Sequence, residues 1–297
     1  MPTGDADARD HADEARCRLC GGGTDLLDRG LVLGRWPARL HRCRSCGYVQ
    51  FASPSWLDEA YADAITSTDL GLLRRSIRSA RRIRDVLAVA GALGGPVLDW
   101  GGGHGTLTRL LRDAGIDCLH WDPRCTNLFA RGFEAEPASR RWSAVVALEV
   151  VEHLVDPWEF FGPVGSMTDL VIFSTEVLPE EQGEPPPLAA WPYYAPEHGQ
   201  HVGFMAERSI RLVASRLGME WTRIGWTHVL SRGLGPLRRL AVGAAPLRWL
   251  AGRLRRTPSL LMTDHRAAVD RRRGSLEARG FSPPTPESHA STNRRGS

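Results

Sequence analysis

The sequence predicts an α/β fold with a mostly parallel sheet covered by helices on both faces, preceded by a small cysteine-rich module. From Pro96 onward, short apolar runs (144–148, 170–173) alternate with helix-like segments (158–164, 207–217). This alternation is typical of a parallel sheet with helices on both faces. Ahead of it, four cysteines form two Cys-x-x-Cys pairs, which predict a separate small unit.

The length of 297 residues leaves room for one large domain and a small module. The first residues are polar and acidic, and the longest apolar stretch, 86–98, is interrupted by glycines and a proline. That stretch is shorter than the roughly 20 residues a membrane-spanning helix needs. We therefore expect a cytoplasmic protein.

All 38 basic residues are arginine, and the sequence contains no lysine. A pyridoxal Schiff base, a phosphate-binding P-loop and a lysine general base each need an amine that this chain lacks. These chemistries are excluded. The net charge of +4 is too small to indicate a nucleic-acid partner by itself.

Composition divides the chain into six segments. Both ends are rich in Pro, Ser and charged residues without periodicity, which predicts disordered tails. Ser53 or Ser55 is expected to cap the first helix of the connector. In the helical extension, leucines and arginines could lie on an anionic membrane or pack across the domain, but Pro236 and Pro246 prevent one long helix. The segments are a tail (1–15), a cysteine module (16–50), a helical connector (51–90), the sheet domain (91–230), the helical extension (231–281) and a second tail (282–297).

The two cysteine pairs are Cys17 with Cys20 and Cys43 with Cys46. Two such knuckles can bring four thiolates around one zinc ion in a zinc-ribbon-like module, and redox-active or incidental thiols are the alternative. A closed four-sulfur site has no position for water, so its Zn²⁺ would be structural. Arginines beside the pairs could touch RNA phosphates or simply face solvent. They are Arg16, Arg18, Arg42 and Arg44.

A glycine cluster, residues 101–105, follows the predicted strand 97–100 and opens the predicted helix 106–114. Glycines there let the backbone turn tightly and approach a ligand, and a helix N-terminus offers free N–H groups. The dinucleotide fingerprint G-x-G-x-x-G does not fit, because Thr106 or Thr108 stands at its last position.

The acid Asp99 followed by Gly101, Gly103 and Gly105 resembles the loop of class I methyltransferases that binds S-adenosylmethionine (SAM). The resemblance implies a Rossmann-like sheet, with this loop around the methionine part of SAM and Asp99 holding its ammonium group. Asp122, at the end of the predicted strand 118–121, is placed to accept hydrogen bonds from the ribose hydroxyls.

A third match begins at Glu149. The segment Glu-Val-Val-Glu-His-Leu-Val-Asp-Pro, residues 149–157, is similar to the segment after the fourth strand in many of these enzymes. Glu149 would then lie at the carboxyl end of a strand, where such sheets bind ligands, and it is a further candidate for binding SAM. A plain glycine turn, a solvated Asp122 and a structural His153 are the alternatives.

The loop from Trp191 to Phe204 combines aromatic rings with histidines and is a candidate acceptor pocket. Together with the cysteine pairs, it resembles bacterial methyltransferases of sugar and polysaccharide pathways. That resemblance implies a small, sugar-like acceptor, methylated on oxygen or carbon. The candidate catalytic residues are Tyr194, Glu197, His198 and His201. Their spacing differs from the His-Glu-His cluster of the deoxysugar enzymes, and packing of the loop is the alternative. Since histidine titrates near neutral pH, His198 is the preferred base and His201 the second choice.

Two rival functions remain on sequence grounds. One is an RNA methyltransferase whose zinc module grips nucleic acid, which the mild charge disfavours. The other is a SAM-binding protein without catalysis.

Overall fold

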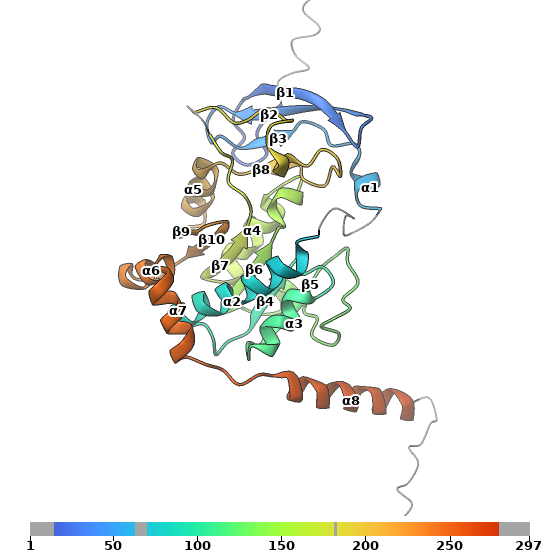
Figure 1. Ribbon diagram of the computed structural model, residues 1–297, viewed down its shortest axis with the longest axis vertical. Helices are drawn as coiled ribbons and strands as arrows, with labels where there is room; N and C mark the ends of the chain where they lie inside the picture. Colours follow the sequence, from blue (N-terminus) through green and yellow to red (C-terminus); the bar gives the residue numbers. More distant parts are fainter. Residues whose placement is uncertain (1–14, 63–69, 181–182, 279–297) are drawn as a thin grey trace, which may run out of the picture.

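The computed structural model of the protein describes residues 15–62, 70–180 and 183–278. The two expected tails, apart from Ala15, lie outside these residues. Figure 1 shows a small sheet at one end of the molecule and a larger sheet, flanked by helices, in the middle. The small sheet has four strands and the large one six. The predicted α/β class with a small N-terminal unit is confirmed.

The large sheet consists of four parallel strands followed by an antiparallel pair. Its order is β5 (Cys118–Trp121), β4 (Val97–Trp100), β6 (Ala144–Leu148), β7 (Leu170–Ser174), β10 (Thr227–Ser231) and β9 (Glu220–Ile224). Strand β10 is antiparallel to both β7 and β9. The four parallel strands agree with their predicted ranges to within one residue.

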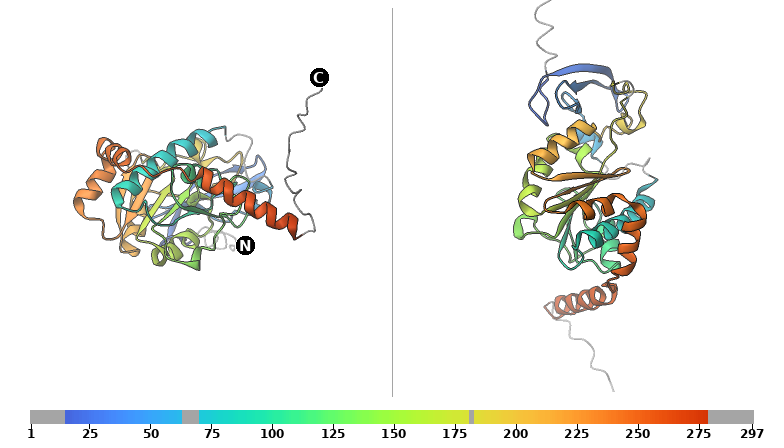
Figure 2. Two further views of the ribbon diagram at one scale, coloured as in Figure 1. Left: turned by 90° about the horizontal axis from the view of Figure 1, so that it is seen from below. Right: turned by 90° about the vertical axis from the view of Figure 1, so that its left-hand side faces the viewer.

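Successive residues of the parallel strands face opposite helical layers. In β6, Val145 belongs to one apolar cluster and Val146 to the other, and Val171 and Ile172 of β7 divide in the same way. Helices cover both faces, as the side view in Figure 2 also shows. One face carries α4 (Trp158–Met167) and α5 (Glu207–Arg216), and the other carries α2 (Leu72–Ala90) and α3 (Thr106–Asp113), where Val242 of α6 (Pro236–Gly243) joins the same apolar cluster. Burial on both faces explains why these strands are continuous apolar runs in the sequence.

The small sheet is antiparallel, and its last strand comes from far along the chain. Its order is β1 (Thr24–Val32), β2 (Trp36–Cys43), β3 (Val49–Phe51) and β8 (Gly203–Phe204). Strand β8 pairs with β3, so residues well beyond position 50 complete the expected module. Trp158 and Arg216, from α4 and α5, both donate hydrogen bonds to the carbonyl of Leu19, which holds the module against the large domain.

The connector begins with a short helix, α1 (Leu57–Ala60), and its cap was predicted wrongly. Neither Ser53 nor Ser55 caps it, because Trp56 occupies the N-cap position. The ring of Trp56 is buried, and its indole N–H donates to the carbonyl of Gly199 at 2.8 Å. Tertiary packing of this tryptophan therefore determines where the helix starts.

The C-terminal extension forms three helices. They are α6 (Pro236–Gly243), α7 (Ala245–Leu254) and α8 (Leu261–Glu277). Pro236 and Pro246 lie in the first turns of α6 and α7, where the missing N–H costs nothing, so the prolines do prevent one long helix. Helix α8 projects from the body in Figure 1. In the part of the chain that the structure describes, no helix combines the length and apolar character needed to cross a bilayer.

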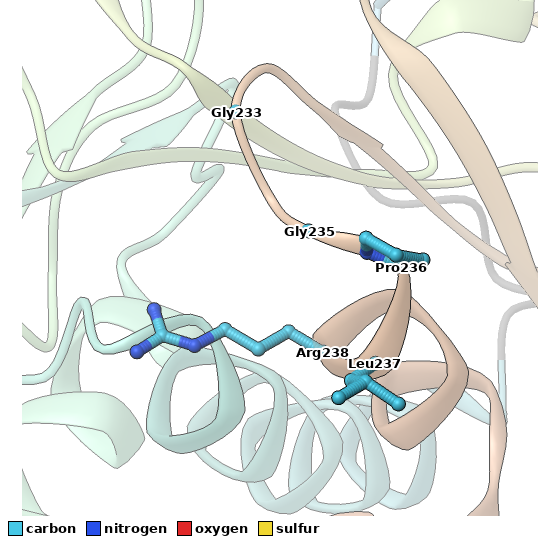
Figure 3. A pocket seen from close by; sticks show the side chains of 5 residues that line it. All are labelled: Gly233, Gly235, Pro236, Leu237 and Arg238. Atoms are coloured by element: carbon cyan, nitrogen blue, oxygen red, sulfur yellow. The ribbon is translucent and has the colours of Figure 1, made fainter.

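A pocket lies where β10 leads into α6 (Figure 3). It is lined by Gly233, Gly235, Pro236, Leu237 and Arg238. Strand β10 ends at Ser231, opposite Leu170 at the start of β7. The pocket therefore lies at the amino end of the parallel strands, away from the edge where open α/β sheets bind ligands.

Candidate functional site

Four polar segments follow the carboxyl ends of the parallel strands. The glycine loop follows β4, Asp122 follows β5, Glu149 follows β6 and Thr175 follows β7. These strands are adjacent and parallel, so their ends meet at one edge of the sheet. This edge is the usual ligand-binding position in open α/β sheets.

The glycine loop requires glycine at position 103 for its backbone conformation, and there is empty space next to this residue. Gly103 has a φ of 56°, in the left-handed region that side chains rarely adopt. A Cβ atom added to Gly103 would meet no heavy atom within 4 Å, whereas one added to Gly101 would lie 2.8 Å from Cγ2 of Val150. The space at Gly103 is therefore open to a ligand, and the loop is closed on the side of Val150.

Asp99 lies beneath the loop. Its side chain is 1% exposed and accepts a hydrogen bond from the hydroxyl of Thr108 at 2.7 Å. Burial raises the pKa of Asp99 to about 6. His120, also buried, bonds through Nε2 to the carbonyl of Gly103 at 2.9 Å. Both residues support the loop from the sheet side, and the contact of Asp99 with an ammonium group stays a prediction.

Asp122 is held in place by backbone N–H groups. Its Oδ2 accepts from Gly103 at 2.9 Å, and its Oδ1 accepts from Arg124 and Cys125 at 2.8 and 2.7 Å. Each carboxylate oxygen has about two acceptor positions, so Oδ2 can still accept from a hydroxyl. The carboxylate is thus fixed beside the glycine loop with acceptor capacity left.

Glu149 adopts a strained backbone conformation, with a φ of 53°. Such strain in a residue other than glycine often marks a functional position. Its carboxylate accepts a hydrogen bond from the Ser174 hydroxyl at 2.5 Å. The Tyr193 hydroxyl donates to Glu152 and also lies 3.4 Å from Oε2 of Glu149. Two carboxylates therefore share one tyrosine hydroxyl.

His201 lies at the centre of a group of rings beside these carboxylates. Its ring centroid is 4.8 Å from that of His153, 4.7 Å from that of Tyr193 and 5.2 Å from that of His198. The Val202 N–H donates to the carbonyl of Glu152 at 2.7 Å, which holds the two segments together.

Tyr61 connects the rings to the glycine-loop side of the site. Its hydroxyl lies 3.1 Å from Nδ1 of His153, and the guanidinium of Arg124 stacks over its ring at 4.8 Å. Arg124 lies two residues after Asp122, in the turn that follows β5. The two halves of the site are therefore neighbours along this edge.

The hydrogen bonds of the two loop histidines differ in a way that matters for chemistry. Nδ1 of His198 accepts from the N–H of Gln200, so in the neutral ring Nε2 carries the proton. Nδ1 of His201 bonds to the carbonyl of Tyr193 at 2.7 Å and must donate, so its Nε2 carries the lone pair. His201 is thus the histidine equipped to accept a proton or bind a metal.

Burial changes the charge state of this cluster. Burial and the charge of Glu149 raise the pKa of Glu152 well above its usual range. Burial lowers the pKa of His153 well below its usual range, and the neighbouring histidines lower it further. At neutral pH His153 is therefore neutral.

The structure brings together some of the predicted catalytic residues and not others. His198 and His201 lie in the ring group, but Glu197 is exposed at the surface. Tyr194 is fully buried, and its hydroxyl donates to the carbonyl of Pro186. The tyrosine at the carboxylates is its neighbour Tyr193. Sequence reasoning did not single out Tyr61, Glu152 or Tyr193, although Glu152 lies inside the quoted 149–157 segment.

The four cysteines have the geometry of a metal site. Cys17 and Cys46 have Sγ atoms 3.6 Å apart, Cys20 and Cys43 have theirs 3.4 Å apart, and all four lie within 4.8 Å of one another. Tetrahedral Zn–S bonds of about 2.3 Å would place the sulfurs about 3.8 Å apart, whereas a disulfide needs about 2.05 Å. The four thiols therefore fit a zinc ion and are not disulfides.

Comparison with known proteins gives one family. Residues 73–223 match the family described as "Methyltransferase domain". A comparison with curated proteins finds no match.

Several solved structures are similar to part of the chain. An O-methyltransferase family protein from Burkholderia thailandensis is 15% identical, with a TM-score of 0.41, over 60% of this chain and 63% of that one. Mitomycin 7-O-methyltransferase is 16% identical, with a TM-score of 0.37, over 59% of each chain. Human N-acetylserotonin methyltransferase, solved with SAM, is 12% identical, with a TM-score of 0.34, over 60% of this chain and 66% of that one. The chain spans less than two thirds of the length of these structures.

Proposed function

The chain belongs to the methyltransferase-domain family, and from that membership we propose that it binds SAM at the glycine loop and methylates a small molecule. Open space beside Gly103, next to the oriented carboxylate of Asp122, is the observation that carries the cofactor site. In this proposal Gly101, Gly103 and Gly105 surround the methionine part of SAM, Asp99 supports the loop or meets the ammonium group, and Asp122 accepts from the ribose.

The acceptor would lie over the cluster of Glu149, Glu152, Tyr193 and His201, one strand end away from the cofactor. Carboxylates, a phenol and imidazoles hydrogen-bond readily to hydroxyl groups, which favours a sugar-like acceptor. The sulfonium of SAM supplies the methyl group, and the protein contributes mainly by holding the nucleophile in line with it. A hydroxyl is the favoured nucleophile and a carbon beside a carbonyl the alternative.

His201 rather than His198 is proposed to act on the acceptor. The sulfonium cannot accept the proton that the acceptor loses. Another group must therefore take this proton or weaken the acceptor's bond to it. Nε2 of His201 carries a lone pair, whereas the corresponding atom of His198 carries a proton in the neutral ring. Tyr194 and Glu197 have no part in this version of the site.

A zinc ion bound by Cys17, Cys20, Cys43 and Cys46 is proposed to be structural. Four thiolates leave no open position for a substrate. The ion would stabilise the small sheet, which receives β8 directly after His201. Zinc would therefore support the acceptor half of the site from a distance.

RNA as the acceptor is disfavoured by the arginines of the module, because their guanidinium groups are engaged within the protein. Arg18 donates to two backbone carbonyls. Arg42 pairs with Glu180 and Glu184, and Arg44 pairs with Asp25. These bonds compete with contacts to phosphate.

The test is transfer of a labelled methyl group from SAM to a panel of nucleotide sugars and glycans, with structured RNA as a second arm. The proposal expects transfer to at least one sugar and none to RNA, and product analysis identifies the methylated atom. Transfer to RNA alone would show that the acceptor is RNA and not a sugar. SAM binding without transfer to any acceptor would support a non-catalytic role.

A further inference from the structure

Three side chains at the acceptor edge have the chemistry of a second metal site. Glu152, His153 and His201 each offer a ligand atom, and these atoms lie within 4.8 Å of one another. Two imidazoles and one carboxylate are a ligand set that zinc and related first-row ions accept in sites with an open position. Ligand atoms around such an ion lie about 3.3 Å apart, so closing the site needs movements of about 1 Å.

The unpaired oxygen of Glu152 points independently to a ligand. The side chain of Glu152 is 0% exposed, and one of its oxygens accepts from the Tyr193 hydroxyl. Among residues 15–62, 70–180 and 183–278, the other oxygen, Oε2, is buried without a hydrogen-bond partner. Buried polar atoms are rarely left in this state, because the lost hydration is not replaced. A cation beside Oε2 would replace it.

The two histidines are oriented as metal ligands commonly are. A metal-binding histidine usually bonds through its other ring nitrogen to a carbonyl, a carboxylate or water. Nδ1 of His201 bonds to the carbonyl of Tyr193, which leaves the lone pair on Nε2. In His153, Nδ1 lies 3.1 Å from the hydroxyl of Tyr61, and when this nitrogen is the donor the lone pair is on Nε2. Both rings are thus fixed by outer contacts.

We propose that Glu152, His153 and His201 bind one divalent first-row transition-metal ion that keeps a position open toward the acceptor. This site contains no sulfur and is therefore separate from the four-cysteine cluster. Its chemical role rests on the proposed methyl transfer. With the ion bound, the Nε2 lone pair of His201 is used on the metal, so the ion would act on the acceptor proton in place of the free imidazole. The ion would bind the acceptor oxygen and lower the pKa of that hydroxyl. The O–H proton leaves to water, the oxygen takes the methyl group as the S–CH₃ bond breaks, and S-adenosylhomocysteine is released.

The first measurement is the zinc content of the full-length protein after incubation with excess Zn²⁺ and removal of unbound ion. Wild type should retain about one Zn²⁺ per chain more than Glu152→Gln or His201→Ala. His198→Ala is the matched control, because it removes a neighbouring imidazole that is not a proposed ligand, and it should keep the wild-type content. The zinc of the cysteine cluster, unchanged in all four proteins, reports that the variants are folded.

A second measurement uses Co²⁺ in place of Zn²⁺. The Co²⁺ spectrum of wild type minus that of Glu152→Gln should show visible absorption from the second ion. This difference should lack the charge-transfer band of a thiolate–cobalt bond. Equal metal contents in wild type and both ligand variants would overturn the proposal. If wild type and both ligand variants contain equal metal and methyl transfer persists, the second ion is rejected and the proposed function stands. If a second ion is bound but no methyl transfer occurs, the metal site stands and the proposed function is rejected.

Discussion

The two halves of the site are built in different ways. The cofactor half is mostly local: Asp99 to Gly105 lead from a strand into a helix, and Asp122 and the supporting His120 come from the neighbouring strand and its end. The acceptor half is gathered from Tyr61, from the turn after β6 and from the loop that leads into β8. A site made of consecutive residues can be recognised in a sequence, whereas a site made of distant segments depends on the tertiary fold. The two halves should therefore fail separately when mutated.

The largest difference between the effect on turnover and the effect on SAM affinity is expected for His201→Ala. Loss of the Nε2 lone pair should lower turnover by about 10²–10⁴-fold and leave SAM affinity unchanged. His198→Ala, which removes the ring whose Nε2 is protonated, should have the smaller effect. Steady-state kinetics of both variants on the identified acceptor check this. The reverse ranking would return the role to His198.

Removal of the zinc ligand Cys43 should damage the acceptor half first. Cys43→Ser is expected to lose the ion and to destabilise the protein by about 3–5 kcal/mol, because the small sheet that includes β8 loses its central support. Metal analysis and thermal unfolding measure both effects. A variant that keeps its zinc content and its Tm would show that the thiols are incidental.

A side chain at Gly103 should damage the cofactor half alone. Gly103→Val places a branched side chain in the open space of the loop, at a φ of 56° that valine adopts poorly. We expect SAM to bind about 100-fold more weakly or worse. Calorimetry on the variant, with unfolding curves to establish that it is folded, gives the result. Unchanged SAM affinity would show that the cofactor does not bind at this loop.

The adjacent tyrosines provide the finest comparison. Tyr193→Phe removes the hydroxyl shared by Glu149 and Glu152 and should reduce turnover by about 10-fold, the effect of one lost hydrogen bond in the site. Tyr194→Phe removes a hydroxyl bonded to the carbonyl of Pro186 and should alter stability only. Equal turnover in the two variants would show that the Tyr193 hydroxyl does not contribute to methyl transfer.

These tyrosines also illustrate what the sequence can predict. The parallel strands were predicted to within one residue, because burial on both faces makes each a continuous apolar run, and the family match confirms the methyltransferase class. Tyr193 and Tyr194 lie in one 3-10 turn, Pro192–Tyr194, and their side chains serve different environments. Which of them faces the carboxylates depends on β8 joining the small sheet, a long-range pairing without a local signal.

The most direct test of the account is calorimetric titration of SAM into three proteins: wild type, Asp122→Ala and His201→Ala. We predict that wild type and His201→Ala bind SAM equally and that Asp122→Ala binds it more weakly by about 1–3 kcal/mol, since an acceptor of the ribose hydroxyls is lost. Failure of wild type to bind SAM, or unchanged affinity in Asp122→Ala together with weakened binding in His201→Ala, would contradict it.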